Sequence, residues 1–198
     1  MGHILDSLQV KLSPYLIQRL YWVFALTFGV TAIVYLLLPL INPSSHNVSS
    51  PAVLTKKVYY SNGSLKKSSE MLGDQLHGVT IEYYPDGKVE WESSYKNNLK
   101  NGLERWYNPN GVLEWECNYL EGKKHGQETV YYPDGKVRRE TTYKNGHKHG
   151  WERVYFKNSQ VQLEVEYYNN MYHGVQRKYT KDGKIVFTHR YENNKRVK

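Results

Sequence analysis

A period of 24 residues constrains the fold of this chain more than any other feature of its sequence. One tyrosine and one glycine recur at each step of the period, at Tyr59, Tyr83, Tyr107, Tyr131, Tyr155 and Tyr179 and at Gly78, Gly102, Gly126, Gly150 and Gly174. Periods of this length are typical of architectures in which each unit covers the apolar surface of its neighbour. The sequence therefore predicts six repeats over residues 55–198, at 55–78, 79–102, 103–126, 127–150, 151–174 and 175–198.

Each repeat is predicted to be a β-hairpin. The turn is expected at Pro-Asp-Gly, as in Tyr83–Lys88, because proline fixes φ and Asp-Gly adopts the left-handed conformations of a tight turn. After this turn apolar and polar side chains alternate, with Trp91 and Tyr95 on one face and Glu92 on the other. A loop such as Lys144–Gly150 is expected to close each repeat. The fold class is therefore mainly β, an elongated single-layer antiparallel meander of about twelve strands.

The segment before the repeats predicts one transmembrane α-helix. Leu20–Ile41 is apolar for 22 residues, and a helix of this length at ~1.5 Å per residue crosses a bilayer core of ~30 Å. A cleaved secretory signal, whose apolar region is usually ~7–15 residues, is one alternative, and a buried helix of a soluble protein is another. Residues 1–19 are expected to form a tail with a short interfacial helix, and residues 42–54 a linker.

The distribution of charge gives the helix an orientation. Lys11 and Arg19 precede the apolar segment, whereas Lys56 and Lys57 lie at the far limit of the flanking window that sets topology. We expect the N-terminus on the cytoplasmic or matrix side of the membrane and the repeats on the opposite side. The formal net charge is +8, and only +1 of it comes from residues 1–54, so the repeats are basic enough to accept an anionic partner.

No residue pattern predicts a catalytic, cofactor-binding or metal-binding site, and the chain is not expected to be an enzyme. Four histidines recur at one predicted loop position, but neighbouring copies are two strands apart, ~9–10 Å, whereas zinc ligands lie at ~2.0–2.1 Å from the metal. Hydrogen bonding within the loops is the expected role of these residues, His77, His125, His149 and His173. Cys117 lies in an apolar row and is expected to be a small packed residue. The recurring glutamates Glu92, Glu116, Glu140 and Glu164 are expected to be solvated strand positions.

Two surfaces are candidates for binding. The first is an aromatic face for a protein partner, formed by Tyr83, Trp91, Tyr95, Tyr107, Trp115, Tyr119, Tyr131, Tyr143, Tyr155 and Tyr167. The second is a basic edge of inter-repeat loops for an anionic partner such as lipid headgroups, formed by Lys96, Lys100, Lys123, Lys124, Lys144 and Lys148. A solvated edge that discourages strand pairing is an alternative interpretation of these lysines. Nucleic acid is not expected as a partner, because of the membrane anchor.

The pattern Tyr-Tyr-x-Asp-Gly-Lys, a following strand, and then Glu, Tyr and Asn-Gly-x-x-His-Gly resembles the MORN repeat, in the variant found in bacterial antitoxin-like proteins. The resemblance covers residues 55–198, and pairs such as Tyr83 with Gly87, Tyr107 with Gly111 and Tyr131 with Gly135 match the glycine-aromatic core of the family. It implies a scaffold whose sheet binds protein partners, sometimes dimerises and touches phospholipid headgroups. Ser159 replaces a turn glycine, and Asn98 and Asn170 replace loop glycines, which predicts looser turns there.

Together these features predict a single-pass membrane-anchored scaffold that presents its sheet to a protein partner, as a structural subunit of a larger membrane complex. The alternative function is a tethering module that contacts anionic phospholipid through the basic edge.

Overall fold

The computed structural model describes residues 52–198. The predicted tail, the transmembrane helix Leu20–Ile41 and nearly all of the predicted linker lie outside the described residues. Within residues 52–198 every regular element is a strand, and no helix there is long and apolar enough to cross a membrane.

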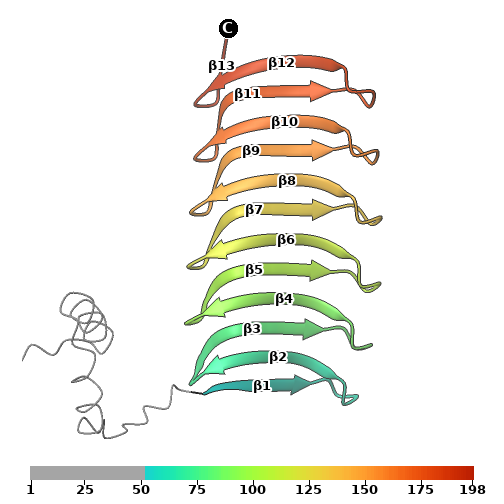
Figure 1. Cartoon of the computed structure of the whole chain (residues 1–198), viewed down its shortest axis with the longest axis vertical. Coiled ribbons are helices and arrows are strands. Elements are labelled where there is room, and N and C mark those ends of the chain that lie inside the picture. The colour runs from blue at the N-terminus through green and yellow to red at the C-terminus, as the bar shows by residue number, and fades with distance from the viewer. Residues whose placement is uncertain (1–51) are drawn as a thin grey trace, which may run out of the picture. The chain divides into compact units, whose positions relative to one another are not determined.

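Thirteen strands form one sheet in which each strand pairs antiparallel with the next along the chain (Figure 1). The strands are β1 (Val53–Tyr59), β2 (Leu65–Leu72), β3 (Gln75–Tyr83), β4 (Val89–Lys96), β5 (Leu99–Tyr107), β6 (Leu113–Leu120), β7 (Lys123–Tyr131), β8 (Val137–Lys144), β9 (His147–Tyr155), β10 (Val161–Tyr168), β11 (Met171–Tyr179), β12 (Ile185–Glu192) and β13 (Lys195–Val197). The predicted mainly β meander is confirmed, with one short strand more than expected. No second layer packs on the sheet within the described residues.

The two edges of the sheet carry different turns. At the edge on the right of Figure 1, each Pro-Asp-Gly segment forms the predicted tight turn, in which the Gly87 amide donates to the Tyr84 carbonyl at 2.9 Å. At the opposite edge, β8 ends at Lys144, which pairs directly with His147 of β9. Asn145 and Gly146 between them have φ values of 52° and 87°, as a two-residue hairpin turn requires. The prediction of a loop over Lys144–Gly150 is therefore wrong, because residues from His147 onward already belong to a strand.

The recurring strand glycines lie at bulges. Opposite β4, the register shifts between Ser93 and Tyr95, where β5 contains extra residues that include Gly102. Gly102 has φ of 116°, and a Cβ added to it would lie 3.0 Å from the Ser94 Cβ, so glycine is required both by the backbone conformation and by the close approach of β4. Bulges of this kind bend strands, and the strands of the sheet are visibly curved (Figure 1).

The sheet has two faces that differ in chemistry, and we name each by its central row of cross-strand neighbours. The packed face is centred on Ser93, Glu104, Cys117, Glu128, Thr141 and Glu152. The ladder face is centred on Glu92, Arg105, Glu116, Thr129, Glu140 and Arg153. Cys117 is 0% exposed and Glu128 is 2% exposed, so the flanking long side chains of the packed face cover its centre without a second layer.

The turns with replaced glycines are not looser. Asn98 and Asn170 adopt φ of 66° and 67°, and each side-chain oxygen accepts a hydrogen bond from the backbone of the preceding turn, from the Leu76 amide at 2.7 Å and from the Lys148 amide at 2.8 Å. Ser159 has φ of 65° and keeps the turn hydrogen bond to the Phe156 carbonyl at 2.9 Å. The expectation of looser turns is wrong, because asparagine tolerates the left-handed conformation and adds a bond that glycine cannot make.

Candidate interaction surfaces

The packed face contains buried ion pairs. The Lys100, Lys124 and Lys148 ammonium groups each form a salt bridge with the carboxylate four residues later, Glu104, Glu128 and Glu152. Arg139 also contacts Glu128, at 3.2 Å. Because the three glutamates are buried, their charges require these partners. The three lysines therefore stabilise the fold by neutralising buried charges.

Aromatic rings flank the same lysines. Lys100 Nζ lies 5.7 Å from the centre of the Trp91 ring and 5.0 Å from that of Tyr119. Lys124 repeats the arrangement with Trp115 and Tyr143, and Lys148 with Tyr167, at 5.3, 5.1 and 4.8 Å. Cations over ring faces at these distances are attracted by the ring quadrupole. The packed face is therefore a surface of paired lysines and glutamates between rings.

Three tryptophans lie side by side on the packed face. Trp91 of β4 pairs with Trp106 of β5, which pairs with Trp115 of β6. The indole of Trp91 is 8% exposed and donates to the Glu104 carboxylate at 2.7 Å, and its ring centre lies 6.0 Å from that of Trp106. Trp106 is 46% exposed. It is the most accessible of the three and was absent from the predicted aromatic face.

The predicted single aromatic face is wrong, because the structure divides its members between both faces. Trp91, Tyr95, Trp115, Tyr119, Tyr143 and Tyr167 lie on the packed face, whereas Tyr107, Tyr131 and Tyr155 lie on the ladder face, where they bond its glutamates. The register shifts between Trp106 and Tyr107 and again between Val130 and Tyr131. A one-residue shift exchanges the two faces of a strand, so spacing along the chain does not carry across the turn. Tyr83, at the equivalent end of β3, is half-buried.

Each tyrosine at the end of an odd strand from β5 to β11 donates to the glutamate 15 residues before it. The pairs Tyr107–Glu92, Tyr131–Glu116, Tyr155–Glu140 and Tyr179–Glu164 have oxygen–oxygen distances of 2.9, 2.7, 2.6 and 2.8 Å. Three of these glutamates also form salt bridges with arginines: Arg105 contacts both Glu92 and Glu116, and Arg177 contacts Glu164. The expectation that the glutamates are simply solvated is wrong, because they are half-buried and hold neighbouring repeats together.

The proton affinities of the tyrosines follow from this environment. Burial, followed by the hydrogen bond to Glu116, raises the pKa of Tyr131 to about 12. Burial and the bond to Glu140 likewise raise the pKa of Tyr155 to about 12. Burial opposes ionisation of Glu164, but the hydrogen bonds from Arg177 and Tyr179 outweigh it and lower its pKa. The ladder face therefore favours the protonated form of Tyr131 and Tyr155 and the charged form of Glu164.

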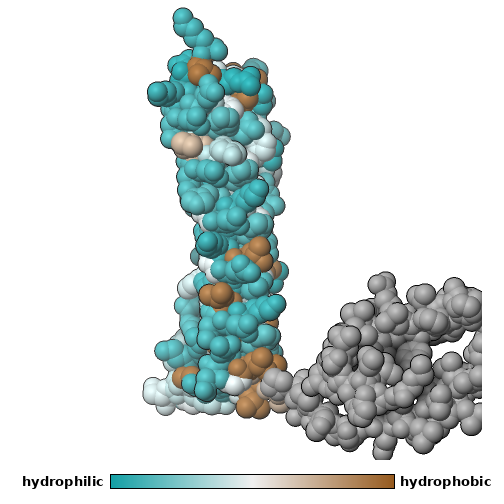
Figure 2. Space-filling view, turned by 90° about the vertical axis from the view of Figure 1, so that its left-hand side faces the viewer, coloured by the Kyte–Doolittle hydropathy of each residue, from teal (hydrophilic) through white to brown (hydrophobic). Residues whose placement is uncertain are grey.

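The predicted basic edge is divided as well. Lys100, Lys124 and Lys148 lie within strands on the packed face, as described above. Lys96, Lys123 and Lys144 flank the two-residue turns and are exposed, and they form no salt bridge with other described residues. Figure 2, which looks at this edge, shows a mostly hydrophilic surface with a few separate hydrophobic patches.

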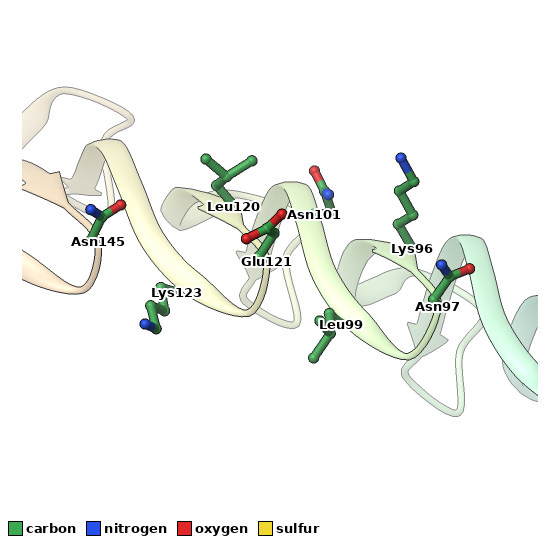
Figure 3. Close-up of a pocket in the computed structure, with 8 residues that line it drawn as sticks. All are labelled: Lys96, Asn97, Leu99, Asn101, Leu120, Glu121, Lys123 and Asn145. Carbon is green, nitrogen blue, oxygen red and sulfur yellow. The ribbon is translucent and has the colours of Figure 1, made fainter.

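A groove of about 520 Å³ crosses the edge at three successive turns. Its lining includes Lys96, Leu99, Leu120 and Lys123, with Lys96 and Leu120 on one side of the ribbon and Leu99 and Lys123 on the other (Figure 3). Leu99 and Leu120 are both exposed. Sequence reasoning missed these two leucines because their positions are not regularly apolar: the equivalents of Leu99 are Gln75, Lys123, His147, Met171 and Lys195, and those of Leu120 are Leu72, Lys96, Lys144, Tyr168 and Glu192.

The histidines and the cysteine have structural roles. The Nδ1 atoms of His77, His149 and His173 hydrogen-bond the Asn97, Asn169 and Asn193 side chains of the next turn at 3.2–3.4 Å. The predicted hydrogen-bonding role is confirmed for these three histidines, although they lie in strands. The prediction fails at His125, whose Nδ1 is buried with no hydrogen-bond partner among the described residues. Cys117 is packed as predicted, and burial raises the pKa of its thiol to about 12. Across residues 52–198, no three His, Cys, Asp or Glu side chains are placed to hold a metal ion.

Four stretches of the chain match the family described as the MORN repeat variant, at residues 76–97, 100–121, 124–145 and 172–193. The predicted repeat type is confirmed for these stretches. MORN repeats are commonly protein- or membrane-interaction modules. No curated protein matches the sequence.

Two solved structures show a partial likeness. The crystal structure of a GtfA/B complex has a TM-score of 0.32 and 14% identity, over 55% of this chain and 20% of that chain. The GtfA/B complex bound to UDP and GlcNAc has a TM-score of 0.27 and 13% identity, over 58% of this chain and 22% of that one. This chain thus spans about a fifth of the length of either one.

Proposed function

We propose, from the premise that four of its repeats are of the MORN variant, that this protein is a membrane-anchored scaffold that holds a partner protein on the packed face of its sheet. In this proposal Leu20–Ile41 is the anchor, with the N-terminus on the cytoplasmic or matrix side and the repeats across the membrane, and the protein is a structural subunit of a larger membrane complex. It performs no catalysis.

The observation that carries the proposal is Trp106. Its indole is 46% exposed at the centre of the row Trp91–Trp106–Trp115, on a sheet with no second layer among the described residues. Tryptophan is strongly enriched among residues that dominate protein interfaces, because its large apolar surface gains most from being covered. The neighbouring aromatic rings and the salt-bridged lysines hold the surface around Trp106 in a fixed arrangement.

The test is co-purification of the full chain from mild detergent, comparing the wild type with Trp106→Ala. Loss of a stoichiometric partner in Trp106→Ala, with an unchanged circular dichroism spectrum, is expected. The matched control is Tyr168→Ala, which removes a ring that is 49% exposed on the other face and should retain the partner. A wild-type chain that purifies as a monomer with no protein partner contradicts the proposal.

A second function has narrower support. The exposed lysines Lys96, Lys123 and Lys144 lie along one edge without salt bridges to described residues, and such charges are attracted to anionic lipid by about 1 kcal/mol each. Because Lys100, Lys124 and Lys148 are paired with buried glutamates, a tethering role rests on the three exposed lysines alone. Salt-sensitive binding to anionic vesicles is the measurement that separates this function from the first.

A further inference from the structure

The row of alternating glutamates and arginines at the centre of the ladder face is interrupted at one strand. We call each arginine position in this row a rung. The row alternates carboxylate and guanidinium groups across the strands, from Glu92 through Arg105 to Glu116, and again from Glu140 through Arg153 to Glu164. Between these two runs, β7 contributes Thr129, which pairs with Glu116 on one side and Glu140 on the other. The position that holds arginine in β5, β9 and β11 is therefore occupied by a short neutral side chain in β7.

At the equivalent positions of other repeats, arginines bond the glutamates of the neighbouring strands. Arg105 reaches both neighbouring strands, with Nη1 3.1 Å from Glu92 Oε1 and Nε 3.2 Å from Glu116 Oε2. Arg177 bonds Glu164 in the same way at 2.7 Å. A planar guanidinium with several fixed donors suits two carboxylates on different strands.

The two glutamates beside Thr129 are left with an incomplete set of cations. Glu116 has Arg105 on one side only. Glu140 accepts hydrogen bonds from Gln127 Nε2 at 2.9 Å and from the Tyr155 hydroxyl at 2.6 Å, and within the described residues it forms no salt bridge. Arg153, its neighbour in register, is directed away, with its guanidinium 3.7 Å from Glu164 and 5.4 Å from the centre of the Trp151 ring.

A groove opens at this point of the face. It has a volume of about 430 Å³, and its lining includes Arg105, Glu116, Thr129, Tyr131 and Glu140. Its carboxylates lie on strands β6 and β8, which are two strand spacings apart, about 10 Å. The groove thus combines two carboxylates, an aromatic ring and one arginine, which already contacts Glu116. Thr129, at the position where neighbouring repeats carry an arginine, is 6% exposed, so the longer side chains beside it cover it and border the open space.

We propose that this groove is a receptor site for the guanidinium group of an arginine side chain on a partner protein, which completes the ladder between Glu116 and Glu140. Arginine fits better than lysine, because a lysine ammonium is a compact, strongly hydrated charge that does not form paired bonds with two separated carboxylates. The site contains two carboxylates in a protein of formal net charge +8. It therefore attracts a single cationic side chain, whereas the rest of the protein repels strongly basic partners. This inference rests on the proposed scaffold function and names the chemistry of a second contact, on the face opposite Trp106.

The test uses the full chain and three fluorescent glycine-serine peptides that differ at one central residue, which is arginine, lysine or citrulline. Fluorescence anisotropy at low salt is expected to show binding of the arginine peptide, binding about tenfold weaker for the lysine peptide, and none for the uncharged citrulline peptide. Guanidinium at low millimolar concentration should displace the arginine peptide more effectively than sodium at equal ionic strength. Equal binding of the arginine and lysine peptides, or no binding of the arginine peptide, overturns the proposal.

The decisive variant is Thr129→Arg, which supplies the missing rung from the chain itself. It should weaken binding of the arginine peptide by about tenfold or more. Because Thr129 is only 6% exposed, the larger side chain displaces its neighbours and should also lower the melting temperature. Thr55→Arg adds the same charge at an exposed position of β1 and should bind as the wild type does. If Thr129→Arg does not fold, Glu140→Gln replaces one carboxylate with an isosteric amide and must also weaken binding; wild-type binding by either folded variant contradicts the site.

Failure of the arginine site and failure of the scaffold function give different results in these experiments. If the arginine peptide fails to bind while a partner still co-purifies in a manner that depends on Trp106, only the arginine site is wrong. If no partner co-purifies but the peptide preferences are as expected, the site remains and the scaffold function is wrong.

Discussion

Tyr131 donates its hydroxyl to the Glu116 carboxylate at 2.7 Å, across 15 residues of sequence and between neighbouring strands of the sheet. The same relationship recurs one repeat earlier and one repeat later, between Tyr107 and Glu92 and between Tyr155 and Glu140. A hydrogen bond to a charged acceptor is stronger than one between neutral groups. The pairs therefore join each repeat to the preceding one.

Tyr131→Phe should lower the free energy of unfolding by about 1–2 kcal/mol, because the half-buried Glu116 carboxylate loses a donor that water replaces only in part. Urea unfolding followed by circular dichroism measures this change. Tyr59→Phe is the control, since Tyr59 is exposed and its hydroxyl bonds no described residue. An equal effect of the two substitutions would show that the bond to Glu116 contributes nothing.

The buried pair Lys124–Glu128 should behave as a unit. Glu128→Leu alone leaves Lys124 and Arg139 without their partner and is expected to cost about 3–5 kcal/mol of stability. Adding Lys124→Met removes one of the two stranded charges and should recover part of that loss. Denaturant unfolding of both single variants and the double variant gives the coupling energy, and strict additivity would argue against the pairing.

The raised pKa values of Tyr131 and Tyr155 predict loss of stability in alkali. Both groups have a pKa of about 12 in the folded chain against 10.0 for a free tyrosine. Below pH 10 both are protonated in the folded and the unfolded chain, so the contribution is complete; between pH 10 and 12 only the unfolded chain ionises, and stability falls. Absorbance titration of tyrosinate, with unfolding curves at each pH, should show late-ionising groups that Tyr131→Phe and Tyr155→Phe remove.

Gly102→Ala should be more damaging than Gly135→Ala. Both glycines have positive φ, 116° and 81°, but a Cβ at residue 102 would lie 3.0 Å from the Ser94 Cβ, whereas a Cβ at residue 135 meets nothing within 4 Å. The turn variant is expected to lose about 1 kcal/mol from its backbone conformation alone, and the strand variant clearly more. Thermal unfolding of the two variants compares them directly, and a smaller effect at residue 102 would contradict the bulge geometry.

Neutralising two sets of lysines should have different effects on lipid binding. If the edge contacts anionic vesicles, Lys96, Lys123 and Lys144 changed to Gln should weaken binding by about 1 kcal/mol per residue without unfolding the chain. Changing Lys100, Lys124 and Lys148 to Gln should instead lower stability, because buried glutamates lose their partners. Vesicle sedimentation and thermal unfolding of both triple variants test this contrast. Reduced lipid binding by the second set at unchanged stability would restore the original assignment.

Most of the architecture could be predicted from local sequence signals. Pro-Asp-Gly determines a tight turn wherever it occurs, and the alternation after Trp91 identifies a strand with two different faces. These signals depend on residues close in the chain, so they remain valid in the folded protein. The sequence predicts a longer loop than the two-residue turn at Asn145–Gly146, because Lys148 and His149 are polar. In the structure both belong to strand β9, where they contact other side chains.

The candidate site was predicted less well. The prediction that all the tyrosines share one face failed at Tyr107 and Tyr131. Each lies beside a register shift, so the alternation of faces seen after the turn does not extend back to the tyrosine before it, and both tyrosines lie on the ladder face. The 24-residue pattern does not point to the exposed Trp106, because the equivalent residues of the other repeats are Val58, Glu82, Val130, Val154 and Lys178.

The sequence by itself determined the repeat, its length, the turns and the serial order of the strands, because each follows from the conformational preferences of neighbouring residues. Only the tertiary structure decided which side chains share a face. Glu128 became buried beside Lys124, Tyr131 came to bond Glu116, and Thr129 came to lie between two glutamates. Those relationships depend on the register between strands, which is set by bulges and by cross-strand packing that no short stretch of sequence specifies.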